Sequence, residues 1–122
     1  MKLEELNIYN LADDISDRIW ELVDDWKPFT RDTIGKQLVR SADSISANIA
    51  EGYGRYFFKE NRNFCYYSRG SLLETKNWLG KASRRGIIAK AEYDRLISDL
   101  DKLHKSLNGY INYITEQSQK QK

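Results

Sequence analysis

Residues 37–55 decide the fold, and they read Gln-Leu-Val-Arg-Ser-Ala-Asp-Ser-Ile-Ser-Ala-Asn-Ile-Ala-Glu-Gly-Tyr-Gly-Arg. The apolar residues here and just before recur mostly at spacings of three and four, which predicts one buried face of an α-helix: Ile34, Leu38, Ala42, Ile45 and Ile49. Ser44, Asn48 and Glu51 fall within about 60° of one another at the border of that face. Gly52 and Gly54 then predict the end of the helix.

The same period predicts three further helices in the rest of the chain. We expect one helix at about 7–26, a second from its N-cap Thr30 to a break at Gly52-Tyr53-Gly54, and two more at about 58–85 and 90–116. Pro28 and Gly86 supply stop signals after the first and the third. Short connections predict an all-α, antiparallel up-down-up-down four-helix bundle. Residues 1–122 are expected to form one domain, with 117–122 as a flexible polar tail.

Composition narrows the class of protein. Of the 122 residues, 31% are charged and 40% are hydrophobic, which suits solvated amphipathic helices. No apolar run approaches the roughly 18 residues of a membrane span. Cys65 is the single cysteine, so it cannot form a disulfide within the chain, and no signal-peptide pattern opens the sequence. These features predict a cytoplasmic protein.

A set of polar side chains beside the apolar faces has two interpretations. The set comprises Ser44, Asn48, Glu51, Ser71 and Glu74. We favour a hydrogen-bonded network that fixes helix register or a subunit contact, because a buried polar group without a partner costs about 1–3 kcal/mol. The alternative takes Glu51 and Glu74 as paired carboxylates for acid–base chemistry or a metal, but no His or Asp completes a ligand set. We expect no catalytic residue, metal or cofactor, and we expect Gly70 to allow close helix approach.

Two motifs carry a family resemblance. Ser-Ile-Ser-Ala-Asn-Ile-Ala-Glu-Gly-Tyr-Gly-Arg at 44–55 and Gly-Ser-Leu-Leu-Glu at 70–74 resemble the four helix bundle proteins, also called ribosomal RNA intervening-sequence proteins. The resemblance implies a homo-oligomeric ring of five subunits, with no established catalysis. The chain is also more distantly similar to the accessory protein of diversity-generating retroelements, which implies a nucleic-acid or nucleoprotein partner.

Charge is segregated along the chain although the net charge is only +2. Residues 1–26 carry eight acidic and two basic side chains, whereas residues 31–90 carry twelve basic and five acidic ones. Arg62, Arg69 and Lys76 recur every seven residues and form a basic stripe that Arg55 extends. An acidic stripe on the first helix consists of Asp13, Asp17, Glu21 and Asp24.

The basic stripe also has two interpretations. Its side chains are either solvated or paired with the acidic stripe, within or between subunits, where an exposed pair contributes about 0–1 kcal/mol. Otherwise they bind nucleic-acid phosphates, with Tyr53 and Tyr56 beside Arg55 available for contact with the ligand. The second interpretation predicts a non-enzymatic scaffold that binds RNA or DNA. The alternative function is a protein-binding or structural oligomer with no nucleic-acid role.

Surplus apolar side chains predict self-association. Six of them lie off the inward faces or at their edges: Trp20, Val23, Val39, Phe57, Tyr66 and Leu72. Such side chains need a second surface against which to bury. Closed cyclic symmetry is the usual way in which identical subunits satisfy identical patches.

Overall fold

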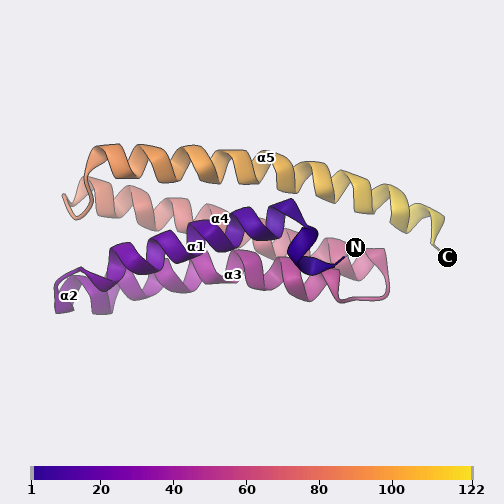
Figure 1. Cartoon of the computed structure of the whole chain (residues 1–122), viewed down its shortest axis with the longest axis horizontal. Coiled ribbons are helices and arrows are strands. Elements are labelled where there is room, and N and C mark those ends of the chain that lie inside the picture. Colours follow the sequence, from indigo (N-terminus) through magenta and orange to yellow (C-terminus); the bar gives the residue numbers. More distant parts are fainter. Residues whose placement is uncertain (1, 122) are drawn as a thin grey trace.

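The computed structural model describes residues 2–121, and every regular element in that range is helical (Figure 1). A short 3₁₀ turn, η1 (Leu3–Glu5), precedes α1 (Asn7–Asp24). The second helix runs without interruption through α2 (Pro28–Thr30), the π-helical turn η2 (Arg31–Gly35) and α3 (Lys36–Tyr53). The third and fourth are α4 (Phe58–Arg84) and α5 (Lys90–Lys120). The described part of the chain is thus four long helices with no strand.

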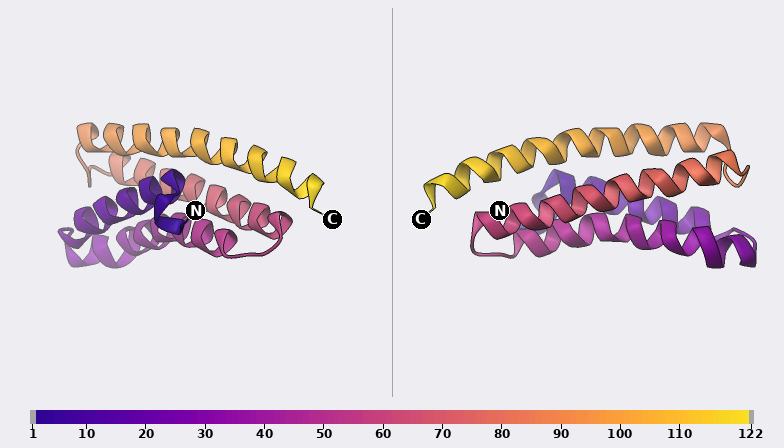
Figure 2. Two further views of the ribbon diagram at one scale, coloured as in Figure 1. Left: turned by 45° about the vertical axis from the view of Figure 1, so that its right-hand side comes forward. Right: turned by 180° about the vertical axis from the view of Figure 1, so that it is seen from behind.

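Consecutive helices lie side by side. Helix α3 packs against both α1 and α4, α4 packs against α5, and α1 makes a smaller contact with α5. The three views agree on this arrangement, in which all the helices run along the long axis of the molecule (Figures 1 and 2). The α1–α2 and α4–α5 connections lie at the left end in Figure 1, and the α3–α4 connection lies at the right end.

The second helix begins three residues earlier than its sequence suggested, with its N-cap at Lys27. Pro28 occupies the first turn, and Lys27 before it has extended backbone angles, φ −60° and ψ 150°. Thr30 already has helical angles and its side chain caps nothing, so the N-cap expected at Thr30 is wrong. The fixed φ of proline is preorganised for the first helical position, where its missing N–H costs no hydrogen bond.

The end of α4 confirms the predicted stop signal. Gly86 has φ 69°, a left-handed conformation that glycine adopts without steric cost. The Ile87 N–H donates to the Ala82 carbonyl at 2.9 Å, and the Gly86 N–H donates to the Ser83 carbonyl at 3.1 Å. These two bonds are those of a Schellman motif.

Helix α3 ends at Tyr53 with Gly54 as its C-cap, as predicted, and Gly52 has a further purpose. It lies inside α3, and Gly54 after it has an ordinary helical φ of −77°. A Cβ atom on Gly52 would lie 2.7 Å from Oδ1 of Asn61 and 2.9 Å from Cβ of Phe64, so its absence lets α3 and α4 approach. Gly70, to which we assigned this role, is exposed and has nothing within 4 Å of a Cβ position, so that assignment is wrong.

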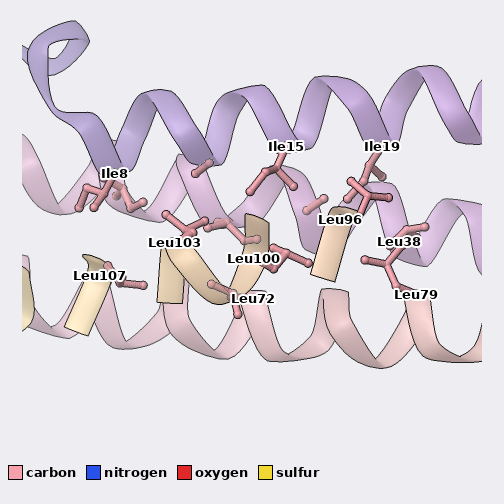
Figure 3. Packing of buried hydrophobic residues seen from close by; sticks show 14 of the residues in the cluster. Ile8, Ile15, Ile19, Leu38, Leu72, Leu79, Leu96, Leu100, Leu103 and Leu107 are labelled. Carbon is pink, nitrogen blue, oxygen red and sulfur yellow. The ribbon is translucent and has the colours of Figure 1, made fainter. Parts of the chain in front are cut away.

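A single hydrophobic core runs the length of the bundle. Figure 3 shows side chains from the helices meeting between the ribbons, among them Ile15, Leu38, Leu72 and Leu100, all fully buried. Each such side chain contributes about 1.5–3 kcal/mol through burial. Val23 and Leu72 belong to this core, so our expectation that they need a partner outside the bundle is wrong.

Helix α5 is longer than predicted and reaches Lys120. Residues 117–120, which we expected to belong to a polar tail, are helical. Gln121 follows them and folds back on the α3–α4 connection, where its side-chain oxygen accepts a hydrogen bond from the Phe58 N–H at 2.8 Å. Its amide nitrogen donates to the Tyr56 carbonyl at 3.2 Å, so one side chain ties the last residue described to the start of α4. Lys122 lies outside the described residues.

Candidate functional site

Two members of the basic stripe lie along the seam between α4 and α5. Arg69 donates from Nη1 to Oδ1 of Asn108 at 2.9 Å, and its guanidinium lies 5.2 Å from the centre of the Tyr66 ring. Lys76 forms an ion pair with Asp101 of α5. Heptad spacing keeps these side chains on one flank of α4, as the sequence predicted, but that flank is the one beside α5.

The other two members, Arg55 and Arg62, differ in their contacts. Arg55 pairs with Glu51 one turn earlier, at 2.7 Å, and lies 4.8 Å from the centre of the Phe64 ring. The Nε atom of Arg62 is buried and has no hydrogen-bond partner within the described residues. No ion pair among those residues joins the stripe to the acids of α1, so pairing of the two stripes within one chain is wrong.

The tyrosines beside Arg55 differ in exposure. Tyr56 is 80% exposed, and its ring contacts that of Phe57 edge to face, with the centroids 4.8 Å apart. Tyr53 is half-buried at the end of α3 and interacts within the chain. Of the two, Tyr56 is therefore the more accessible to a ligand.

The expected polar network does not connect α3 with α4 within one chain. Ser44 donates to the Arg40 carbonyl, and Asn48 donates to the Ser44 carbonyl, both within α3. Glu74 accepts a hydrogen bond from the Trp78 indole at 3.0 Å, within α4, and the Ser71 carbonyl accepts one from Thr75. Glu51 pairs with Arg55. The subunit contact that we also considered stays a prediction.

Other hydroxyl groups connect the helices instead. Ser68 donates to the Ile45 carbonyl at 2.8 Å, and Thr75 lies 3.0 Å from the Ser41 hydroxyl, so two buried bonds join α4 to α3. Between α1 and α3 the pairing is reciprocal, because Ser16 donates to Asp43 and Ser46 donates to Asp13. The serines were visible in the sequence, but their partners lie 23 or more residues away, and only packing selects them.

A buried polar cluster lies where α4 meets α5. Asn61 donates to the Tyr110 hydroxyl at 3.1 Å, and the Cys65 thiol lies 3.6 Å from Oδ1 of Asn61. Burial raises the pKa of Tyr110, an effect that the hydrogen bond from Asn61 partly offsets. Burial likewise raises the pKa of Cys65 to about 12, because the thiolate would lose its hydration.

Cys65 is therefore expected to resist alkylation while the protein is folded. An ordinary thiol has a pKa of about 8.5, so at pH 8 a pKa of about 12 leaves roughly a thousandfold or more less thiolate, the species that reacts. Iodoacetamide labelling followed by mass spectrometry measures this rate, and labelling in guanidinium chloride supplies the unprotected control. Equal rates in the two conditions would contradict the buried position.

The two carboxylates considered for catalysis do not contact the same groups. Glu51 and Glu74 are both exposed and bind different partners, Arg55 and Trp78. Residues 2–121 contain no group of three or more His, Cys, Asp or Glu side chains arranged to hold a metal ion. None of the helices in this range is long and apolar enough to cross a membrane.

A groove, called here the α1–α3 groove, lies between α1 and α3. It has a volume of about 520 Å³ and is lined by Trp20, Val23, Asp24, Arg31, Gly35, Lys36, Val39 and Arg40. A Cβ atom on Gly35 would lie 2.7 Å from the Val23 side chain, so glycine here brings η2 against α1. Sequence periodicity places Trp20 and Val39 at the edges of two helices, but only the packing of those helices forms a groove between them.

Exposed cations gather at one end of the bundle, called here the basic end. Lys27 lines a shallow depression together with Asp25, Gly86 and Ile87. The α1–α2 connection therefore lies beside the α4–α5 connection. Arg84 and Arg85 immediately precede Gly86 and are exposed. Within the described residues Lys27, Arg84 and Arg85 form no ion pair, whereas Arg55 and Lys76 of the basic stripe do.

Comparison with known proteins agrees with this architecture. A crystal structure of a protein of unknown function from the S23 ribosomal protein family of Bacteroides thetaiotaomicron VPI-5482 superposes with a TM-score of 0.77 at 24% sequence identity. The match covers 85% of this chain and 97% of that one, and at this identity it shows a shared fold. No curated protein matches the sequence. The family model for the 23S rRNA-intervening sequence protein matches residues 4–109, so the chain belongs to that family.

Proposed function

We propose that this protein is a non-enzymatic, self-associating scaffold, an up-down-up-down bundle whose copies assemble into a closed oligomer. The observation that supports the proposal is the number of large apolar side chains that the core leaves exposed. Eight large side chains are at least 40% exposed, and they come from α1, α2, α4, α5 and the α3–α4 connection: Trp20, Phe29, Tyr56, Phe57, Tyr66, Tyr67, Leu73 and Tyr113. Such surfaces on a small domain mark interaction sites. A ring of five is the assembly that the family resemblance implies.

Light scattering coupled to size-exclusion chromatography tests the proposal. We expect a molar mass that is an integral multiple of 14.3 kDa at micromolar concentration. Polar substitution of exposed aromatics, such as Tyr66→Ser with Tyr67→Ser, should reduce that mass while far-UV circular dichroism stays unchanged. A wild-type protein that elutes as a monomer over the accessible concentration range would refute self-association.

Nucleic-acid binding is a second candidate, and the basic end favours it. Lys27, Arg84 and Arg85 are exposed and form no ion pair with any residue from 2 to 121, so they offer charge that phosphates could neutralise. Repetition in an oligomer would multiply this charge, although each chain carries only +2. The partner in this second candidate function is RNA, DNA or a nucleoprotein.

A salt titration of single-stranded RNA and DNA binding tests this candidate and locates the surface. Replacing Arg84 and Arg85 with Gln is expected to flatten the dependence of log K on log salt by about one to two, because each lost phosphate contact removes up to about 0.9 from the slope. Arg62→Gln with Arg69→Gln is the comparison, since these side chains lie against the bundle. A larger effect of the second pair would assign binding to the basic stripe. Absence of any salt-dependent binding would leave a protein-binding or structural oligomer.

A further inference from the structure

We propose that the α1–α3 groove binds a short amphipathic helix of another protein, and that this helix has one basic and one acidic flank. The inference rests on the proposed scaffold role, for which it names a partner and a surface, and it involves no contact between copies of this chain. The shape of the groove, its length and the opposite charges of its two borders support it.

The groove is apolar at its base and has an exposed aromatic side chain at its edge. Val23, Gly35 and Val39 line it, and Trp20 beside them is 58% exposed. An amphipathic helix binds to such a groove by laying its apolar face along the base. Trp20 is expected to be the main contact, because buried tryptophans often dominate the free energy of an interface.

The groove is short and is closed at one end. Its border on η2 and α3 lies within residues 31–40, which span about 15 Å or nearly three helical turns. Beyond this stretch hydrogen bonds close the seam between α1 and α3, since Ser16 donates to Asp43 and Ser46 donates to Asp13. The groove therefore accommodates about three turns of a partner helix.

The two borders of the groove carry opposite charges. The α1 border is acidic, and its exposed side chains beside Trp20 are Asp17, Glu21 and Asp24. The border on η2 and α3 is basic, and its exposed side chains are Arg31, Lys36 and Arg40. Within residues 2–121 no ion pair crosses the groove, and Arg31 pairs only with its neighbour Asp32. Both borders therefore retain charge that a partner could neutralise.

The opposite borders select the occupant. A nucleic acid or a uniformly acidic segment would meet like charge on the α1 border, and a uniformly basic segment would meet like charge on the α3 border. A second copy of this chain is disfavoured by area, because a stable interface takes about 20–30 residues from each partner, whereas eight residues line the groove. A helix with one basic and one acidic flank neutralises both borders. It does so in one direction along the groove only, because reversal would place like charges together.

Three synthetic peptides provide the test. They are stapled helices of about four turns that share an apolar leucine face and differ in their flanks: one lysine and one glutamate flank, two glutamate flanks, or two lysine flanks. Fluorescence anisotropy of the labelled peptides measures their affinities for the full chain. The wild-type protein should bind the mixed-flank peptide about tenfold or more tighter than the other two, because each of those places like charges along one border. Trp20→Ala should weaken this binding about tenfold or more.

Charge-reversal variants should change which peptide is preferred. Lys36→Glu with Arg40→Glu makes the α3 border mainly acidic, so this variant should prefer the peptide with two lysine flanks. Glu21→Lys with Asp24→Lys makes the α1 border mainly basic, so that variant should prefer the peptide with two glutamate flanks. A changed preference, unlike a loss of binding, also shows that each variant is folded.

A matched control carries the same change of charge outside the groove. Lys59→Glu with Lys105→Glu alters two exposed lysines that form no ion pair in the part of the chain that the structure describes. This variant should keep the wild-type preference for the mixed-flank peptide. A preference that changes in the control as well would show that net charge and not the groove selects the peptide, which would overturn the inference.

Light scattering of the same samples separates this inference from the proposed self-association. Failure of the wild-type protein to bind any of the three peptides, equal affinities for all three, or an unchanged preference in the groove variants would each overturn helix docking while the assembly stands. A wild-type mass that falls when the mixed-flank peptide is added would assign the groove to a second copy and would also overturn it. A monomeric wild-type protein that binds the mixed-flank peptide would overturn self-association and support the docking site.

Discussion

Replacing Leu72 with alanine is expected to lower the free energy of unfolding by about 2–5 kcal/mol. Leu72 is completely buried on α4 and lies in the middle of the core in Figure 3. Truncation removes the transfer free energy of three carbons and leaves a cavity that neighbouring side chains cannot fill without moving. Urea unfolding followed by circular dichroism, at one protein concentration for all variants, gives the value.

The neighbouring residue supplies the control for this prediction. Leu73 is 51% exposed in the single chain, so Leu73→Ala is expected to change the free energy of unfolding by no more than about 0.5 kcal/mol when it is measured at a protein concentration below that of association. The two variants differ only in which face of α4 loses the side chain. Equal losses of stability at the two positions would mean that the helix is rotated from the orientation described.

Gly52→Ala is expected to destabilise the protein by about 1–3 kcal/mol, although alanine is the better helix former. The new Cβ would lie 2.7 Å from Oδ1 of Asn61 and 3.0 Å from its carbonyl oxygen. Relief of these contacts has to move α4 away from α3 or displace Asn61, which binds Tyr110 and Cys65. Thermal and urea unfolding both measure the loss.

Gly70→Ala is the matched control, because it adds the same methyl group to α4 where nothing lies within 4 Å. There the higher helix propensity of alanine acts alone, and stability should rise by up to about 1 kcal/mol. A stabilising Gly52→Ala would show that α3 and α4 do not approach as closely as described.

Local sequence features predicted where the helices begin and end better than they predicted which surfaces of the helices are covered by neighbours. The starts of α4 and α5 at Phe58 and Lys90 agree with the prediction, and Gly86 ends α4 as its sequence indicated. Spacing also placed Arg62, Arg69 and Lys76 on one flank of α4. It did not show that α5 covers that flank, because the partners Asn108 and Asp101 lie 39 and 25 residues away.

The polar network shows the same division. Ser44 and Asn48 stand at the border of the apolar face, and helical geometry alone made them candidates for contact with α4. Ser41 and Ser68 make the buried contacts instead, because the rotation of α3 against α4 sets which border position enters the interface. The rotation of α3 against α4 depends on the side chains of both helices at once, and no single segment specifies it.

The sequence by itself determined the four helices, their approximate ends and the family to which the chain belongs, because hydrophobic period, proline and glycine act over a few residues. Only the tertiary structure decided that Gly52 and not Gly70 brings helices together, that Gln121 binds the start of α4, and that Trp20 borders a groove with opposite charges. The physical reason is the distance along the chain over which each kind of interaction acts. Helix formation depends on neighbours within one or two turns, whereas close approach, pairing and grooves depend on atoms that only packing brings into contact.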